Sequence, residues 1–228
     1  MIDGDTIKLA DGRSVRYIGI DTPEAMKRRG KNWEFDPEPY AVAAKEYNRE
    51  LVSGKRVRLE YDVEKQDKYG RWLAYVHVDD NVMINSELLR QGLAVLYTFP
   101  PNVKYMDLLL EAQNEARRNK RGLWGSLKGI AAEKAYENTG KGFCAVRGAV
   151  TDIYVAADRV FLNFGQDRKK GLTAVIYSRN IAFFRAQGID PAIYYKGRNV
   201  EVVGKIEYKR GPRMVIDNPS QITVINAK

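Results

Sequence analysis

Apolar and polar residues alternate along short runs in the first half of the chain, and such alternation predicts β-strands. These runs lie at residues 6–9, 14–20, 55–62 and 72–78. Asp11-Gly12 separates the first two runs, which predicts a β-hairpin. Apolar residues recur at helical spacing over 40–51, 84–92 and 103–119, so we expect three helices there. The polar stretch 25–39 predicts a loop.

The pattern weakens after residue 126 and resumes at residue 143, so it divides the chain in two. Beyond the gap it predicts a helix at 180–187 and six strands, at 143–151, 159–164, 172–177, 200–208, 214–216 and 222–225. The gap ends in residues 137–142, whose sequence Glu-Asn-Thr-Gly-Lys-Gly is typical of a linker. We therefore expect domains at 1–126 and 143–228, joined by a linker at 127–142.

The order of the predicted elements indicates the fold class, which is mainly β with helices (α+β). In the first domain this order suits a small closed five-stranded barrel with helices packed against it. In the second, strands followed by one helix and more strands suit an oligonucleotide-binding (OB) barrel. The tail of that domain, residues 197–206 and 218–222, resembles the end of such barrels. We expect two five-stranded OB-type barrels in tandem.

Two residue counts restrict the possible chemistry. The chain has one cysteine, Cys144, so it forms neither an intrachain disulfide nor a cysteine-built zinc site. Its one histidine, His77, lies in an alternating strand pattern, where an ordinary structural position is expected. Catalysis would therefore depend on carboxylates, arginines, lysines or a hard metal ion. No run approaches the roughly 20 apolar residues that cross a bilayer, so we expect no membrane partner.

The charge of the chain is unevenly distributed. The formal net charge is +9, which suggests a polyanionic partner, although such a surplus is often only a solvated surface. Residues 1–140 hold 23 Lys and Arg against 22 Asp and Glu, whereas residues 141–228 hold 15 against 7. Nearly all of the excess therefore lies in the second domain, which we expect to bind nucleic acid.

Three short segments of the first domain contain residues suited to phosphodiester hydrolysis. They are Asp3-Gly4-Asp5-Thr6, Arg16 with Asp21-Thr22-Pro23-Glu24, and Asp67-Lys68-Tyr69-Gly70-Arg71. Each alone is typical of a turn, a helix start or a charged hairpin. Together they provide carboxylates for a hard cation, a carboxylate to direct water, and guanidinium groups for the charge that develops on phosphorus.

With these motifs in order, the segment from Ile2 to about Trp124 resembles the staphylococcal nuclease (thermonuclease) family. The resemblance implies that Asp5 and Asp21 bind calcium through their side chains and Thr22 through its backbone carbonyl. Calcium accepts carboxylate and carbonyl oxygens in irregular geometry, whereas magnesium requires a tighter octahedron. The implied cofactor is therefore Ca²⁺.

The same resemblance implies three catalytic residues. Glu24 accepts a proton from the attacking water or orients it, and Arg16 and Arg71 clamp the phosphate. Arginine suits both positions because its planar fork meets two phosphate oxygens at once. Strict strand alternation would put Arg16 and Asp21 on opposite faces of the sheet. A bulge at Gly19, or a strand that ends before Asp21, would remove this difficulty.

Three further residues match family positions that contact the substrate: Lys68, Tyr69 and Tyr97. Taken singly, a solvated hairpin lysine and two barrel-rim tyrosines are equally good interpretations of them. The sequence departs from the family pattern in three places. Most of the first strand before Ile2 is missing, the 25–39 loop is longer, and Phe99 stands where a second tyrosine is expected.

The resemblance implies a calcium-dependent nuclease, a hydrolase that cleaves DNA and RNA, prefers single strands and leaves 3′-phosphate ends. No obligatory protein partner is evident. A catalytically inactive nucleic-acid-binding scaffold is the alternative, but the presence of all five proposed catalytic and metal-binding side chains favours the enzyme. The second domain could instead be a structural or protein-binding unit. The compartment stays open; a secreted or cell-envelope location, with a leader absent from this sequence, is the expectation.

Overall fold

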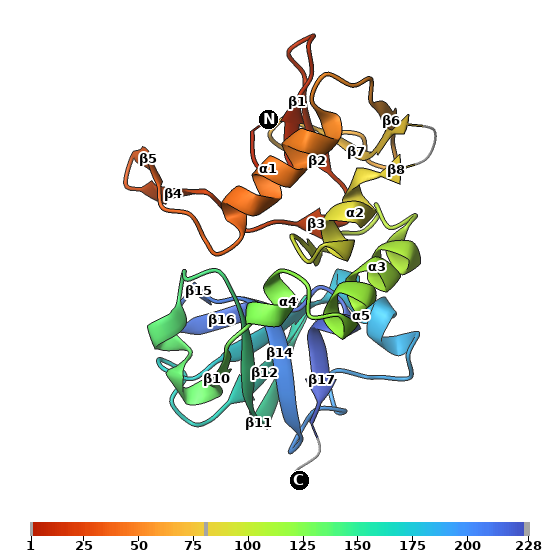
Figure 1. Cartoon of the computed structure of the whole chain (residues 1–228). Helices are drawn as coiled ribbons and strands as arrows, with labels where there is room; N and C mark the ends of the chain where they lie inside the picture. The colour runs from red at the N-terminus through yellow and green to blue at the C-terminus, as the bar shows by residue number, and fades with distance from the viewer. Residues whose placement is uncertain (1, 80–81, 226–228) are drawn as a thin grey trace. The chain divides into compact units, whose positions relative to one another are not determined.

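The computed structural model describes residues 2–79 and 82–225, and the chain divides into two compact units, Met1–Ser126 and Leu127–Lys228 (Figure 1). Strands predominate in both units and helices accompany them, so the predicted fold class, mainly β with helices, is confirmed. Within the described ranges, no helix combines the length and apolar character needed to cross a membrane.

The first unit contains nine short strands and four helices within its described residues. The strands are β1 (Thr6–Lys8), β2 (Ser14–Tyr17), β3 (Ile20–Asp21), β4 (Met26–Arg29), β5 (Asn32–Phe35), β6 (Arg58–Glu60), β7 (Trp72–Val78), β8 (Val82–Met83) and β9 (Val95–Leu96). The helices are α1 (Ala41–Val52), α2 (Ile84–Arg90), α3 (Met106–Arg118) and α4 (Leu123–Ser126). The helix predicted at 103–119 begins three residues later than expected, because its first residues form a turn.

The main sheet of the first unit has the strand order β1-β2-β7-β6, with β8 paired to β7. Strands β2 and β7 are parallel, and the other pairs are antiparallel. In the described part of the chain no ladder joins β6 back to β1, so the sheet is open, whereas the sequence predicted a closed five-stranded barrel. The predicted strand 14–20 is also divided, because β3 leaves this sheet and pairs with β9.

The core of this unit lies between the sheet and the helices. Its fully buried residues include Val15 and Ala74 from the sheet and Leu88 and Leu109 from the helices. His77 is buried in β7, the structural position expected from the sequence.

Two buried asparagines fix segments of backbone that lead to the site described below. Asn48 of α1 donates to the carbonyl of Gly4 at 3.0 Å and accepts from the Tyr17 hydroxyl at 2.9 Å. Asn85 of α2 donates to the carbonyl of Ile18 at 2.8 Å and accepts from the Val76 amide at 2.9 Å. Since a buried amide without partners would be costly, these bonds hold the two segments in one place.

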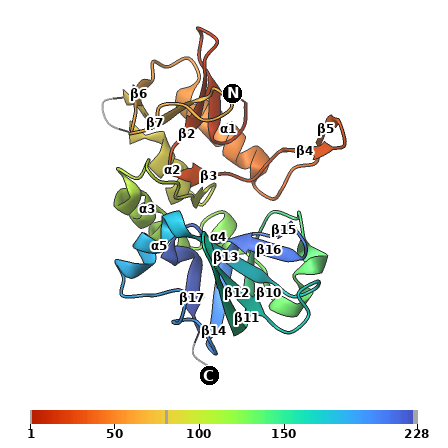
Figure 2. The same ribbon diagram turned by 180° about the vertical axis from the view of Figure 1, so that it is seen from behind.

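Residues 25–39, predicted as a loop, instead contain a hairpin of β4 and β5. The strands pair in the register Met26↔Phe35 and Arg28↔Trp33. Gly30 and Lys31 form the connection, and Gly30 has a φ of 63°, which suits the first central position of a type II′ turn. Figures 1 and 2 both show this hairpin extending away from the rest of the first unit. The sequence did not reveal it because charged residues occupy both of its faces.

The second unit is built around one large sheet. Its strands are β10 (Gly129–Ala131), β11 (Phe143–Ala156), β12 (Arg159–Phe164), β13 (Thr173–Tyr177), β14 (Asn199–Lys205), β15 (Glu207–Tyr208), β16 (Pro212–Val215) and β17 (Ile222–Val224). It also has helix α5 (Ser178–Arg185) and the 3-10 turns η2 (Ala132–Lys134), η3 (Tyr136–Asn138) and η4 (Pro219–Gln221). The strand order is β15-β16-β13-β12-β11-β14-β17, with β10 paired to β11.

The prediction of a linker at 127–142 was wrong, because most of this segment belongs to the second unit. Strand β10 pairs in parallel with β11, from Gly129↔Ala145 to Ala131↔Arg147. Ala132 and Ala135 are both fully buried in the core of that unit. Small alanines and glycines have no strong hydrophobic period, so the sequence pattern concealed this packing.

Gly19 is the point at which the first sheet divides. Its φ is 81°, a value that glycine adopts readily and other residues rarely. A Cβ built on Gly19 would lie 2.4 Å from Cδ1 of Leu109 in α3, far inside contact distance. Its carbonyl accepts from the Tyr97 amide at 3.0 Å, beside the β3 and β9 pair. The fold therefore requires glycine here for two separate reasons, backbone conformation and space.

We predict that Gly19→Ala destabilises the first unit by roughly 2–5 kcal/mol, from a left-handed backbone penalty plus overpacking against Leu109. Gly12→Ala is the matched control, since Gly12 has a φ of 90° but open space around its Cβ position. Gly12→Ala should therefore cost only about 1–2 kcal/mol. All three tryptophans, at 33, 72 and 124, lie in the first unit, so urea unfolding followed by tryptophan fluorescence measures this unit within the whole chain. Equal losses in the two variants would contradict the packing argument.

Candidate active site

A buried arginine joins two aspartates in the first unit. Nη1 of Arg16 lies 2.5 Å from Oδ2 of Asp5, and Nη2 donates to Oδ1 of Asp21 at 3.0 Å. The side chains of Arg16 and Asp5 are largely buried, while Asp21 is partly exposed. Two carboxylates thus converge on the end of one guanidinium. We call Arg16, Asp5, Asp21 and the adjoining Thr22 the Arg16 cluster.

The local fold explains how these residues meet. Asp5 directly precedes β1, and its neighbour Thr6 pairs with Arg16 of β2, which places Asp5 and Arg16 close together. The turn through Ile18 and Gly19 then breaks the alternation between Arg16 and Asp21, so that both side chains point to one place. The opposite-face difficulty of a regular strand is thereby removed by the positive φ of Gly19.

Thr22 completes the cluster from the other side of Asp5. Its backbone amide and its hydroxyl both donate to Oδ2 of Asp5, at 2.9 and 3.1 Å. Gly4 permits this approach, because a Cβ at that position would lie 2.8 Å from Oγ1 of Thr22 and 2.9 Å from Cβ of Ala44. The glycine of the Asp3-Gly4-Asp5 segment is therefore needed for packing as well as for the turn.

The charges of the cluster depend on one another. Burial raises the pKa of the Asp5 carboxyl above its ordinary value, and the neighbouring Arg16 only partly opposes this. Burial acts to lower the pKa of Arg16, but the nearby Asp5 and Asp21 outweigh it and hold that pKa above its ordinary value. Arg16 consequently remains a cation at any working pH. When both aspartates are ionised, the cluster has a net negative charge.

The donor atoms of the cluster suit a hard cation. Asp5 and Asp21 provide carboxylate oxygens that bind the two terminal nitrogens of one guanidinium, and Thr22 adds a backbone carbonyl one residue along the chain. Oxygen donors with irregular arrangement are the kind that calcium accepts. In the ranges that the structure describes, no group of three or more His, Cys, Asp or Glu side chains could hold a metal. Any ion here would thus use two carboxylates, carbonyl oxygen and water.

Glu24 lies on the exposed rim of the cluster, two residues beyond Thr22. Its negative charge contributes to holding the pKa of Arg16 high, so it is within electrostatic reach of the guanidinium. The Glu24 amide donates to Oε2 of the buried Glu38 at 3.0 Å, and the Glu38 amide donates back to the Glu24 carbonyl at 2.9 Å. Glu38 therefore fixes the backbone from which the Glu24 side chain extends.

Arg71 belongs to a second cluster on the turn that precedes β7. Its Nε donates to Oδ2 of Asp67 at 2.8 Å, and its amide donates to Oδ1 of Asp67 at 3.0 Å. Lys68 and Arg71 both lie over the ring of the exposed Tyr69, at 5.0 and 5.7 Å from its centroid. Burial acts to raise the pKa of Asp67, but the hydrogen bonds from Arg71 dominate and lower it. The carboxylate is thus ionised and holds the guanidinium in one direction.

The two clusters hold their guanidinium groups with different carboxylates: Arg71 pairs with Asp67, whereas Arg16 pairs with Asp5 and Asp21. Their strands are adjacent, because Trp72 and Leu73 of β7 lie opposite Val15 and Arg16 of β2. Arg71 is one residue before this parallel pair begins. A phosphate between the clusters would have one guanidinium from β2 and another from the turn that leads into β7.

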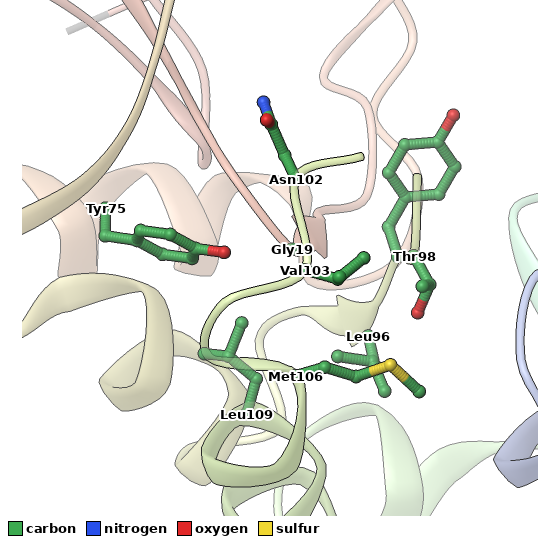
Figure 3. A pocket seen from close by; sticks show the side chains of 9 residues that line it. Gly19, Tyr75, Leu96, Thr98, Asn102, Val103, Met106 and Leu109 are labelled. Carbon is green, nitrogen blue, oxygen red and sulfur yellow. The ribbon is translucent and has the colours of Figure 1, made fainter. Parts of the chain in front are cut away.

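Tyr97, predicted to contact substrate, forms a flat aromatic pair with Phe99. Their ring centroids are 6.2 Å apart and the rings are inclined by 23°. Tyr97 also lines a small pocket. Figure 3 labels other residues of its lining, among them Gly19, Leu96 and Leu109. The cavity volume is about 10 Å³, which is about that of one water, so no base fits inside it. The outer faces of the two rings are the surface that a base could stack on.

Three residues of the site were not predicted as functional: Asp3, Glu38 and Asp67. Asp3 accepts from the Asp5 amide at 3.1 Å, and Asp67 holds Arg71. Both lie inside the motifs that drew attention, so their position beside the expected residues was an available signal. Glu38 lies 14 residues beyond Glu24 across a segment predicted as a loop, and nothing in the sequence pattern indicated their contact.

Comparison with known proteins gives consistent results. The family described as "Staphylococcal nuclease homologue" matches residues 14–126. A thermonuclease of Staphylococcus intermedius is 44% identical over 127 residues, which cover 54% of this chain and 72% of that protein. A thermonuclease of Staphylococcus hyicus is 37% identical over 129 residues, or 55% and 73% of the two chains. Endonuclease YncB of Bacillus subtilis (strain 168) is 41% identical over 128 residues, or 54% and 58%.

The matched family range ends at the boundary of the first unit and begins after Asp5. Arg16, Asp21, Thr22, Glu24 and Arg71 all lie within it, whereas Asp5 joins the set through its contacts with Arg16 and Thr22. The extent of the match and the cover of both thermonucleases by this chain lead to one conclusion: the chain belongs to the staphylococcal nuclease family.

Proposed function

We propose that this chain is a calcium-dependent nuclease that hydrolyses phosphodiester bonds of DNA and RNA and leaves 3′-phosphate ends. The observation that supports this best is the Arg16 cluster, in which a guanidinium and two carboxylates converge beside an exposed glutamate. Such a set has a cation for the phosphate, oxygen ligands for a metal and a base for water within one small region.

Each residue has a distinct part in this proposal. Glu24 orients water and accepts its proton; its exposed side chain on a backbone fixed by Glu38 suits this role. Arg16 and Arg71 stabilise the charge that develops on the phosphate oxygens. Asp67 is a positioning residue for Arg71. A substrate phosphate would compete with Asp5 and Asp21 for the Arg16 guanidinium.

The proposed metal ligands are the side chains of Asp5 and Asp21 and the carbonyl of Thr22. When bound, calcium would supply Lewis-acid polarisation of the phosphate. Without it, two carboxylates remain beside the place where a polyanion must bind, and their charge exceeds what Arg16 alone can balance. The electrostatics of the cluster therefore favour a bound cation whenever substrate is present.

Lys68, Tyr69 and Tyr97 are the proposed substrate-binding residues. Tyr69 is 73% exposed and has two cations near its ring, while Tyr97 presents a flat pair with Phe99. Exposed aromatic rings stack on bases that are free of a partner strand, and neighbouring cations meet the backbone. This arrangement favours single-stranded or frayed substrate.

The second unit is proposed as an OB-type barrel that holds polynucleotide. Residues 127–228 contain 17 Lys and Arg against 9 Asp and Glu. The sheet closes partly through Gln221, whose amide donates to the Val203 carbonyl of β14 at 3.2 Å and the Val215 carbonyl of β16 at 3.4 Å. A partly open barrel with basic surface is typical of domains that bind single strands.

We expect degradation of single-stranded DNA with calcium, little with magnesium and none in excess chelator. The donor set explains the order, since calcium accepts carboxylate and carbonyl oxygens in irregular geometry, whereas magnesium requires a tighter octahedron. Product ends can be identified by polynucleotide kinase labelling before and after phosphatase treatment. Full activity in chelator would show that the reaction needs no metal ion. Products with 5′-phosphate ends would contradict the proposed 3′-phosphate products.

Glu24→Gln should lower kcat on single-stranded DNA by about 10²-fold or more and leave KM nearly unchanged, because a general base acts chiefly in the transition state. Glu111→Gln is the matched control: Glu111 is an exposed carboxylate on α3 that pairs with Arg118. The control should retain wild-type kinetics. Comparable losses in the two variants, or normal turnover in Glu24→Gln, would place the base elsewhere.

Deletion of residues 127–228 should weaken binding to long single strands and spare cleavage of a dinucleotide-sized substrate. Each phosphate contact that is lost makes the slope of log affinity against log salt shallower by about 0.7. The deletion begins after Ser126 because residues 129–135 pack within the second unit. Circular dichroism and tryptophan fluorescence establish that the remaining unit is folded. An unchanged salt slope in a folded truncation would favour a structural role for the second unit.

A further inference from the structure

The hairpin of β4 and β5 has two different faces. Residues opposite one another in an antiparallel pair share a face, and alternate residues of a strand do too. One face therefore holds Met26, Arg28, Trp33 and Phe35, which we call the aromatic face. The opposite face holds Lys27, Arg29, Asn32 and Glu34.

The opposite face is stabilised by its own ion pairs. Arg29 lies 3.2 Å from Glu34 and 3.1 Å from Asp36, and Lys27 lies 3.5 Å from Asp36. These contacts help to hold a two-stranded hairpin, which alone is marginally stable in water. The charges on this face are thus largely balanced within the hairpin.

The aromatic face lacks such internal compensation. Trp33 is 65% exposed and Phe35 68%, so their rings face solvent. Arg28 donates to the carbonyl of Gly30 at 3.1 Å. Among the residues that the structure describes, no carboxylate pairs with Arg28 or Lys31. Two exposed rings and Arg28 on one face, with Lys31 in the connecting turn, form a surface suited to an anionic partner that also has flat apolar groups.

The hairpin starts and ends at the proposed active site. Met26 follows Glu24 by two residues, and the returning strand leads to Glu38, which bonds the Glu24 amide. The Asp36 amide donates to the Ala25 carbonyl at 3.3 Å and closes the base of the hairpin. Arg28 is four residues from Glu24, roughly 13 Å of extended chain. A nucleic-acid strand held at Glu24 therefore has the hairpin within its reach.

We propose that the aromatic face of this hairpin is a binding surface for single-stranded nucleic acid, on which bases stack on Trp33 and Phe35 while Arg28 and Lys31 contact phosphates. The proposal rests on the proposed nuclease function and extends it, because it assigns part of substrate binding to a segment outside the catalytic residues. Stacking on exposed rings accepts every base, so the surface would bind without sequence preference.

The test measures binding of the full chain to a fluorescein-labelled oligothymidylate by anisotropy, in chelator so that no strand is cut. Trp33→Ala should weaken binding about tenfold, within the range for loss of one base–aromatic stack. Trp33→Phe should restore most of the affinity, since a ring remains. Asn32→Ala, on the opposite face of the same hairpin, is the matched control and should bind as the wild type does.

Two arginine variants test the charge argument separately. Arg28→Gln should make the salt slope shallower by about 0.7, the value for one contact with a single strand. Arg29→Gln should change it less, because that guanidinium is already paired with Glu34 and Asp36. Equal slope changes for the two variants would overturn the assignment of phosphate contacts to the aromatic face.

The outcomes distinguish this proposal from the function on which it rests. Unchanged affinity in Trp33→Ala, with wild-type protein that binds and cleaves, overturns the hairpin surface alone. Wild-type protein that neither binds single strands in chelator nor cleaves them with calcium overturns the nuclease proposal as well. A changed oligomeric state of Trp33→Ala on size-exclusion chromatography, without a change in affinity, would show that the face contacts protein and would also overturn the proposal.

Discussion

The ion pairs of Arg16 with Asp5 and Asp21 are the interaction on which the arrangement of the site depends. A guanidinium out of water is costly unless carboxylates meet it with good geometry, and here two of them do. Loss of either aspartate would leave buried charge with less compensation. The need to pair Arg16 therefore constrains three segments of backbone at once: the approach to β1, the strand β2, and the strand β3.

That constraint has consequences in the surrounding backbone. Gly19 takes a φ of 81° so that β3 can leave the sheet, and Gly4 lacks a side chain so that Thr22 can reach Asp5. The buried Asn48 and Asn85 donate to the carbonyls of Gly4 and Ile18. Gly4 is one of these two glycines, and Ile18 directly precedes the other. Glycine and buried polar groups are individually unfavourable in a core, and here each one is compensated by a specific contact that fixes the backbone around Arg16.

How far the sequence predicted the structure differs between elements for physical reasons. Strand β7 has the predicted bounds, because its residues form an almost wholly apolar run, and Ala74 to Val78 are all buried. The hairpin of β4 and β5 was missed, since both of its faces contain charges and neither is in the core. The segment at 129–135 was mistaken for a linker because its alanines pack by being small, which leaves no hydrophobic period.

In the candidate site, too, some contacts were predictable from the sequence and others were not. Short motifs indicated Asp5, Arg16 and Asp21, and the structure brings these three together. The contact of Glu38 with Glu24 depends on how the chain returns after a hairpin, which no local pattern encodes. Arg71 lies in the turn before β7, next to the strand that contains Arg16, and this neighbourhood comes from the parallel pairing of β2 with β7, which no local sequence pattern encodes.

The distribution of charge connects the proposed active site with the surfaces proposed to bind a long strand. Asp5, Asp21 and Glu24 place more negative than positive charge around Arg16, which suits a metal ion but repels a polyanion at longer range. Residues 1–126 have 21 Lys and Arg against 20 Asp and Glu, so the first unit as a whole adds little attraction. In the function proposed above, affinity for a long strand comes from local surfaces with cations and exposed rings, such as the aromatic face, and from the basic second unit. Because these surfaces use charge and stacking rather than base edges, they would increase affinity without selecting a sequence, which is what a degradative enzyme requires.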